Sequence, residues 1–288
     1  SGLIDRLTLQ IASRALDWLA GLPQQAGGED KHDPVLGRLK LSINISARTL
    51  TNRALFDELA ALCRHKDIPL ERIILELTET SAMEDAAVSL NTLTHMRLLG
   101  FSLSIDDFGT GYSSMVQLVR MPFTEIKVDK SFVMTAMTSS ESRAVVRSVV
   151  DLGRSLGIET TAEGVEDDET LAFLNSLHCD IAQGYLVSKP LFAADVPRWY
   201  VQRRDAMEAK RLHALHSLDL LDTPPEERFD RITRLAAEVF SVGTALISLV
   251  DSDRQWFKSR VRYDTEETPR SIAFCSRTIE TDDIMVVE

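Results

Sequence analysis

The chain alternates between short strand-like runs and longer helix-like segments, and most of the strand-like runs end in polar residues. The strand-like runs cover residues 39–45, 73–77, 99–105, 124–128, 159–162 and 180–182. Helix-like spacing of apolar residues marks 3–21, 55–62, 88–98, 145–156 and 171–177. Such repeated units predict an α/β fold with a parallel sheet. Polar residues at so many strand ends favour a closed β/α barrel, in which those ends share one face, over a doubly wound open sheet.

The composition is that of a globular protein with an acidic balance. Of 288 residues, 44% are hydrophobic and 26% are charged, and the formal net charge is −12. This charge argues against nucleic-acid polymers and anionic membranes as partners. The chain has no apolar run of about 20 residues and no signal peptide, so we expect a cytoplasmic protein without a membrane segment. Cys63, Cys179 and Cys275 lack the spacing of a zinc site or a disulfide framework.

The segment 104–114 carries the most specific chemical pattern. Two adjacent carboxylates, Asp106 and Asp107, follow an apolar run, and Gly109 and Gly111 come soon after them. Paired acids at a strand end, followed by an adaptable glycine loop, suit a divalent cation and a phosphate. An Asp cap followed by an ordinary turn explains the same residues without a ligand. The segment alone leaves both interpretations open.

Other predicted strand ends add oxygen donors and one cationic side chain. The donors are Asn44, Glu76, Asp106, Asp107 and Glu163, and the cation is Lys127. Hard oxygen ligands match Mg²⁺ or Mn²⁺ better than zinc or copper. Asp106 is a candidate to bridge two such ions. Taken singly, Asn44, Lys127 and Glu163 are also explained as a strand-end hydrogen-bonding residue, a solvated edge residue and a helix cap.

Six ordered segments resemble the motifs of the EAL-type cyclic di-GMP phosphodiesterases. They are INIS at 43–46, ELTE at 76–79, IDDFGTGYSS at 105–114, IKVD at 126–129, AEGVE at 162–166 and QGYL at 183–186. The resemblance covers residues 1 to about 195. It implies a modified (β/α)₈ TIM-like barrel with one antiparallel strand. It also implies cleavage of cyclic di-GMP to linear pGpG with Mg²⁺ or Mn²⁺ in a two-metal site.

The same resemblance assigns roles to single residues. One metal ion would be held by Asn44, Glu76 and Asp106, and the second by Asp106, Asp107 and Glu163. The catalytic residues would be Glu163, Lys127 and Asp107, with Lys127 orienting the attacking water and screening the phosphate, and Glu163 ligating metal or accepting a proton. Substrate binding or support of the loop would fall to Glu79, Gln183, Glu166, Gly109 and Thr110. Glu79 would brace the loop after Asp107, and Gln183 would contribute to the shell of metal-bound water.

Two points of this interpretation stay open. A receptor that binds cyclic di-GMP without hydrolysing it is the alternative to an enzyme, and the enzyme is favoured by the intact residues Asp106, Asp107, Lys127 and Glu163. The Glu-Ala-Leu strand that names the family supplies a metal-ligating glutamate, and the chain begins just after the point where it would lie. Without that strand we expect weaker metal binding, slower hydrolysis, and exposed strand edges that favour a homodimer.

The last third of the chain predicts a separate unit. We assign residues 1–195 to the barrel, 196–218 to an interdomain helix and 219–288 to an incomplete sensor domain. The segments FDRIT at 229–233, SLVD at 248–251, DRQWFKS at 253–259 and FC at 274–275 resemble GAF sensor domains. The resemblance implies that an unidentified small molecule or signal regulates the hydrolysis.

Overall fold

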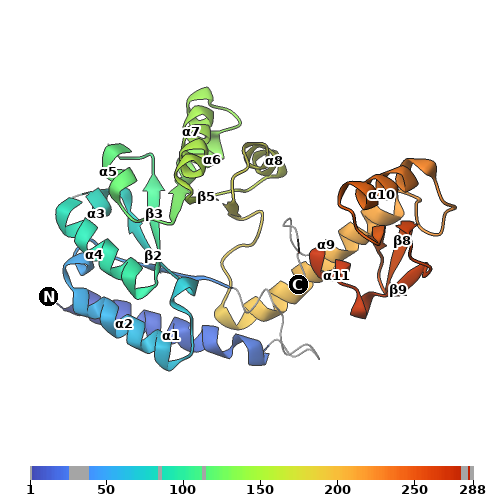
Figure 1. The fold of residues 1–288 in the computed structure, drawn as a ribbon. Coiled ribbons are helices and arrows are strands. Elements are labelled where there is room, and N and C mark those ends of the chain that lie inside the picture. The colour runs from blue at the N-terminus through green and yellow to red at the C-terminus, as the bar shows by residue number, and fades with distance from the viewer. Residues whose placement is uncertain (1, 26–38, 84–85, 112–114, 280–284, 286–288) are drawn as a thin grey trace. The chain divides into compact units, whose positions relative to one another are not determined.

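The protein, seen in a computed structural model, is described over residues 2–25, 39–83, 86–111, 115–279 and 285. The chain divides into two compact units, residues 1–197 and 198–288. Figure 1 follows the elements from the first to the last along the chain. Within the described ranges, no helix has both the length and the apolar character needed to cross a membrane.

The first unit is a parallel sheet whose strands alternate with helices. Its strands are β1 (Leu41–Asn44), β2 (Ile73–Thr78), β3 (Ser102–Phe108), β4 (Glu125–Val128), β5 (Glu159–Glu163) and β6 (Ile181–Gln183). Its α-helices are α1 (Leu3–Gln25), α2 (Arg53–His65), α3 (Glu79–Met83), α4 (Ala86–Leu99), α5 (Met115–Arg120), α6 (Lys130–Thr135), α7 (Ser140–Leu156) and α8 (Asp168–Leu177). Short 3₁₀ turns are η2 (Thr49–Thr51), η3 (Leu70–Arg72) and η4 (Ala193–Asp195).

The strands lie side by side in chain order, and every neighbouring pair is parallel. A doubly wound sheet reverses its order at a switch point, so the unbroken order excludes that alternative for these strands. Lys40, just before β1, forms an ion pair of 2.8 Å with Glu159, the first residue of β5. A flat sheet would separate these two strands by about 19 Å, because neighbouring strands lie about 4.8 Å apart. The sheet is therefore curled into a half-barrel.

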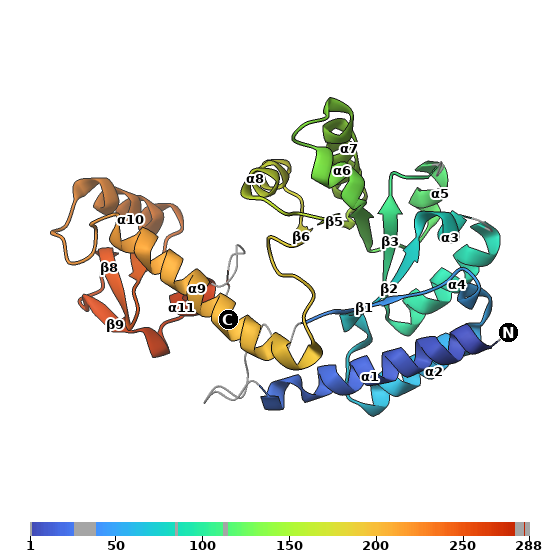
Figure 2. The same cartoon turned by 180° about the vertical axis from the view of Figure 1, so that it is seen from behind.

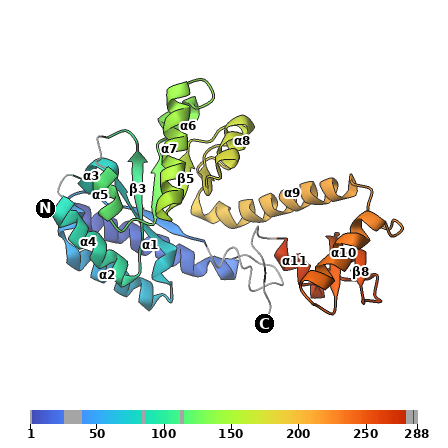
Figure 3. The same cartoon turned by 45° about the horizontal axis from the view of Figure 1, so that its top comes forward.

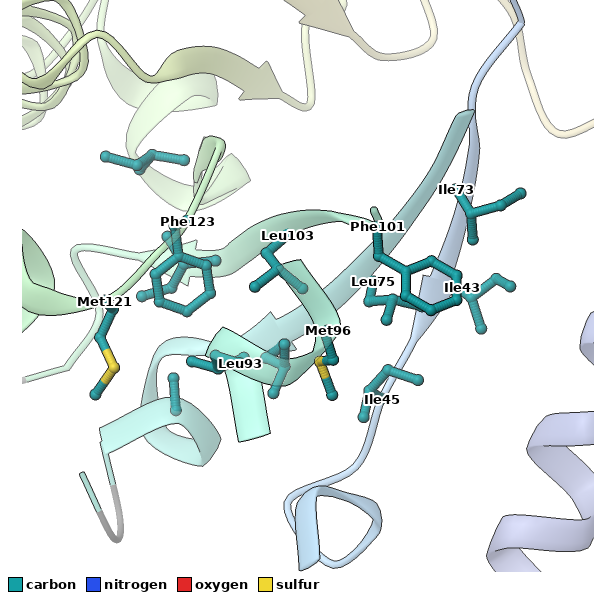
Figure 4. Packing of buried hydrophobic residues seen from close by; sticks show 14 of the residues in the cluster. Ile43, Ile45, Ile73, Leu75, Leu93, Met96, Phe101, Leu103, Met121 and Phe123 are labelled. Carbon is teal, nitrogen blue, oxygen red and sulfur yellow. The ribbon is translucent and has the colours of Figure 1, made fainter. Parts of the chain in front are cut away.

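The two faces of the curled sheet differ because side chains alternate along each strand. Leu75 and Leu103 point to the outer face and belong to the hydrophobic core. Figure 4 shows these two side chains with Leu93 and Met96 of α4. Figures 2 and 3 show the helices on this side of the sheet, with α1 beside α2 and α6 beside α7. The inner face carries the polar side chains that form the candidate site.

One strand begins later than its sequence predicted. The apolar run 99–105 predicted a strand that begins at Leu99 and ends on the two carboxylates. Instead α4 continues through Leu99, and β3 runs from Ser102 through both carboxylates to Phe108. Gly100 ends the helix, because it adopts a φ of +112° while its amide donates to the carbonyls of Met96 and Arg97. The short helices α3, α5 and α6 were also not predicted.

Two predicted segments cannot be compared with the structure. The glycines and mixed charges of 24–37 predict a solvent loop, and almost all of this segment lies outside the described residues. Tyr112, Ser113 and Ser114, the end of the glycine motif, lie outside them as well.

The second unit combines an antiparallel sheet with helices. Its strands are β7 (Ala245–Val250), β8 (Arg254–Val261) and β9 (Glu267–Pro269). Its α-helices are α9 (Val196–His216), α10 (Glu227–Val239) and α11 (Cys275–Thr278), and its 3₁₀ turn is η5 (Arg270–Ile272). Helix α9 begins at the boundary of the units. β8 lies between β7 and β9, and α10 packs on β7 and β8. The buried Lys258 of β8 pairs with Glu226, just before α10, at 2.6 Å.

A charged network connects α9 to the loops of this second sheet. Glu208 accepts hydrogen bonds from Arg211 at 2.8 Å and from Arg270 at 2.6 Å. Arg211 also donates to the carbonyl of Val250 at 2.7 Å. The hydrogen bond from Arg211 and that from Arg270 outweigh partial burial and lower the pKa of Glu208 to about 2. The ionised form of Glu208 therefore stabilises the folded unit.

We expect Glu208→Gln to reduce stability at neutral pH and to have a smaller effect in acid. A carboxylate with a depressed folded pKa stabilises the fold above its ordinary value of 4.5, and this contribution is lost as pH falls from there towards 2. Urea unfolding at pH 7, 5 and 4 measures the difference between variant and parent. Glu238→Gln, at an exposed site on α10, is the control. An equal loss at all three pH values would contradict the expectation.

Candidate active site

Lys127 lies at the centre of the inner face of the sheet. From β4, its ammonium contacts carboxylates that stand on three other strands. Its Nζ lies 2.5 Å from Oε1 of Glu163, 3.3 Å from Oε1 of Glu76 and 3.4 Å from Oδ1 of Asp106. None of these four side chains is more than 17% exposed. The contacts therefore form a compact charged cluster, called here the Lys127 cluster, at the carboxyl ends of the strands.

Burial and charge act against each other in the Lys127 cluster. Burial favours the neutral amine of Lys127, but its hydrogen bond to Glu163 and the charges of the neighbouring carboxylates outweigh this effect and raise its pKa. Burial also raises the pKa of Glu163, although Lys127 opposes that shift. Lys127 is therefore held as a cation, while Glu163 binds a proton more readily than an exposed glutamate does.

Asp106 and Asp107 face the same site because β3 is irregular. Adjacent residues of a regular strand point to opposite faces. The register between β3 and β4 shifts between Ile105 and Phe108, and Asp107 adopts a φ of +55°. A bulge of this kind redirects a side chain, and Asp tolerates left-handed backbone better than most residues do. The irregularity thus turns two neighbouring carboxylates towards Glu163.

Asp106, Asp107 and Glu163 form an arrangement of the size that a metal ion requires. One carboxylate oxygen from each lies within 4.8 Å of the other two. Among the described residues, no other group of three or more Asp, Glu, His or Cys side chains meets this criterion. Burial raises the pKa of Asp107, and the neighbouring charge of Asp106 adds to this effect. Three oxygen donors whose negative charge the single ammonium of Lys127 offsets only in part suit a hard divalent cation.

The buried side chain of Glu79 holds the loop that follows Asp107. Its Oε2 accepts hydrogen bonds from the backbone amides of Gly109 at 2.9 Å and Gly111 at 3.2 Å. The hydroxyl of Thr110 donates to the carbonyl of Asp107 at 2.8 Å. One carboxylate oxygen of Glu79 thus links two backbone amides of the loop.

Asp129 is a member of this site that the sequence interpretation did not include. It is 8% exposed, directly follows β4 and caps the N-terminus of α6. Although burial acts the other way, hydrogen bonds from the hydroxyl and amide of Ser131, together with one from Asp107, lower its pKa. Because Asp129 follows Lys127 by two positions, the alternation of a strand places both on one face. The two-residue spacing from Lys127 is the sequence signal that could have identified Asp129 as a site residue.

Three other predicted residues lie at the same end of the sheet but are exposed. Asn44 ends β1 as the register partner of Glu76, and Gln183 ends β6 as the register partner of Glu163. Glu166 follows β5 by three residues. In the part of the chain that is described, no hydrogen bond or ion pair joins these three side chains to the Lys127 cluster.

Comparison with models of known protein families shows to which family the first unit is related. A family model described as the EAL domain matches residues 1–190. The chain belongs to the EAL domain family. The match covers nearly all of the first unit and ends before the second.

Individual relatives of this EAL chain are named as phosphodiesterases. The cyclic di-GMP phosphodiesterase RocR of Pseudomonas aeruginosa is 38% identical over 190 residues, which are 66% of this chain and 46% of RocR. This chain thus spans less than half the length of that relative.

Two solved structures of EAL proteins resemble the first unit. The PaMucR phosphodiesterase of Pseudomonas aeruginosa, in complex with c-di-GMP, has a TM-score of 0.58 at 33% identity, covering 68% of this chain and 77% of that chain. BlrP1 of Klebsiella pneumoniae, in complex with manganese and cyclic di-GMP, also has a TM-score of 0.58, at 30% identity, covering 66% of this chain and 45% of that chain. Both agree with the α/β class and the curled sheet.

We expect Gly111→Ala to loosen the loop that Glu79 holds. A Cβ at this position would lie 2.7 Å from Oε1 of Glu79, so that the carboxylate must move and its bonds to the two amides weaken. Loss of such hydrogen bonds should speed amide hydrogen exchange at residues 109 and 111 by roughly 2- to 10-fold. Gly2→Ala is the control, because nothing lies within 4 Å of its added Cβ. Unchanged exchange in Gly111→Ala would show that Glu79 does not hold the loop.

Proposed function

We propose that the first unit hydrolyses cyclic di-GMP with the help of divalent cations. The observation that carries this proposal is the trio of Asp106, Asp107 and Glu163, placed within 4.8 Å of one another beside the ammonium of Lys127. This arrangement offers both a place for a hard cation and a fixed positive charge for a phosphate. The phosphodiesterase name of RocR and the bound cyclic di-GMP of PaMucR and BlrP1 support the choice of substrate.

The residues present fit Mg²⁺ or Mn²⁺. The trio provides carboxylate oxygens alone, which are the ligands that these ions prefer. Asp106, Asp107 and Glu163 would hold one ion, and Asn44, Glu76 and Asp106 would hold a second. Bound ions would supply a water of lowered pKa and would neutralise charge on the phosphodiester. Manganese in the BlrP1 structure supports this assignment.

The chain's own residues would position the substrate and move a proton. Lys127 is fixed by three carboxylates, so its ammonium would meet a phosphodiester oxygen with little reorganisation. Glu163 would either ligate a metal ion or accept a proton from the attacking water, and burial, which raises its pKa, suits the second role. Opening of one of the two phosphodiester bonds would give linear pGpG.

The proposal extends to the parts of the protein around this site. We infer that the half-barrel belongs to the modified (β/α)₈ barrel that the motifs imply. The second unit would be a GAF-like domain that regulates hydrolysis in response to a small molecule or signal, in a cytoplasmic homodimer. The resemblance of segment 229–233, within α10, and of segment 253–259, most of which lies on β8, supports the GAF assignment.

Incubation with cyclic di-GMP and Mn²⁺, followed by chromatography, tests the proposed hydrolysis. We expect linear pGpG from the parent, and at least about 100-fold less from Asp106→Asn, which is the scale on which a charged catalytic group acts. Asp151→Asn, on the exposed surface of α7, should keep the parent's rate. Circular dichroism shows whether each variant is folded.

Two outcomes would contradict this account in different ways. Binding of cyclic di-GMP by the parent without any product would identify a receptor instead of an enzyme. Full turnover by folded Asp106→Asn would show that the carboxylate trio is not the catalytic site.

A further inference from the structure

A second layer of polar side chains lies beneath the Lys127 cluster on the inner face of the sheet. Side chains two positions apart on a strand share one face, so Asp106, Lys127 and Glu163 each have a polar neighbour one step further from the strand's end, whereas Ile74 lies below Glu76. These pairs, with the lower residue first, are Ser104 and Asp106 on β3, Glu125 and Lys127 on β4, and Thr161 and Glu163 on β5. Ser104 and Glu125 are register partners on neighbouring strands, so their side chains stand next to each other.

The lower layer is more deeply buried than the cluster above it. Ser104 is 0% exposed, Thr161 is 2% exposed and Glu125 is 5% exposed. The hydroxyl of Thr161 donates to Oε1 of Glu125. The other carboxylate oxygen, Oε2 of Glu125, and the hydroxyl of Ser104 have no hydrogen-bond partner among the described residues. Two register partners on adjacent strands therefore each bury a polar atom without a hydrogen-bond partner among the described residues.

Unpartnered polar atoms in a protein interior reduce its stability, most strongly when one of them belongs to a carboxylate. Buried water molecules in proteins bind at such places and make about three hydrogen bonds each. A carboxylate oxygen accepts hydrogen bonds, and a serine hydroxyl both donates and accepts them. One water molecule between them can satisfy both atoms at once.

We propose that Ser104 and Glu125 bind one ordered water molecule beneath Lys127. The water donates one hydrogen to Oε2 of Glu125 and shares a second hydrogen bond with the hydroxyl of Ser104. Glu125 is then held at both oxygens, by Thr161 on β5 and through the water by Ser104 on β3. Water fits this place better than a metal ion, because two oxygen donors are far fewer than the six or so ligands that a hard cation takes.

This water site is distinct from the proposed cation site, and it concerns hydration and folding. The inference stands whether or not the chain hydrolyses cyclic di-GMP. Its consequence is that β3, β4 and β5 are linked by one hydrogen-bonded layer directly below the residues that would do the chemistry.

The direction in which Ser104→Ala changes the stability of the fold shows whether the Ser104 hydroxyl is bridged by a water or has no partner. If a water bridges the two side chains, Ser104→Ala removes a hydrogen bond and should raise the unfolding constant by roughly 2- to 10-fold. If Ser104 has no partner, removal of its hydroxyl should leave stability unchanged or increase it. Ser102→Ala, on the same strand, is the control, because its hydroxyl makes only a long, exposed bond of 3.3 Å to the carbonyl of Glu71.

Glu125→Gln and the double variant show whether the two residues share a ligand. If the two sites are independent, the double variant should change the unfolding constant by the product of the two single effects. If one water joins the two side chains, the change in the double variant should be smaller than this product. A fully multiplicative result would overturn the proposal.

A high-resolution crystal structure of the parent distinguishes a bridging water from a direct contact. We expect density for one water within hydrogen-bond distance of both the Ser104 hydroxyl and Oε2 of Glu125. A direct hydrogen bond between these two side chains, or an absence of density between them, would overturn the proposal even if the unfolding data agreed with it.

Discussion

The contact of one ammonium with three carboxylates governs the arrangement of the first unit. Lys127 of β4 meets acids from β2, β3 and β5 in a largely buried setting. Buried charges of one sign are tolerated only when they are paired or bind a cation. The pairing requires that four strands present their polar side chains to a common centre, which a curled sheet permits and a flat one does not. The ion pair between Lys40 and Glu159 shows the same curl at the opposite end of the strands.

The irregular backbone of β3 is the second condition for the site. Without the register shift and the left-handed Asp107, one of the two adjacent aspartates would face the hydrophobic core. Residues held in such conformations persist when their surroundings fix them. Here Glu79 fixes the loop just beyond the bulge through the amides of Gly109 and Gly111. The geometry of the carboxylate trio thus depends on a buried glutamate on α3 as well as on the trio itself.

The sequence predicted much of this arrangement and missed what depends on distant contacts. Alternating segments predicted the α/β class and the positions of the six strands, and the motifs predicted that Lys127 and the carboxylates share one end of the sheet. The bulge was not predictable, because it is a property of the register between β3 and β4. The late start of β3 was signalled by Gly100, but an apolar run does not reveal where a helix ends and a strand begins. The polar layer of Ser104 and Glu125 was not predicted, because these residues become neighbours only through the register of β3 with β4.

The position of bound manganese tests the central claim most directly. Crystals of the protein soaked with Mn²⁺, and measured at a wavelength where manganese scatters anomalously, would locate the ion. The account predicts an anomalous peak within ligand distance of carboxylate oxygens of Asp106, Asp107 and Glu163, with Lys127 beside it. A peak elsewhere, or no peak at a concentration of Mn²⁺ that supports hydrolysis, would contradict the assignment of this cluster as the catalytic centre.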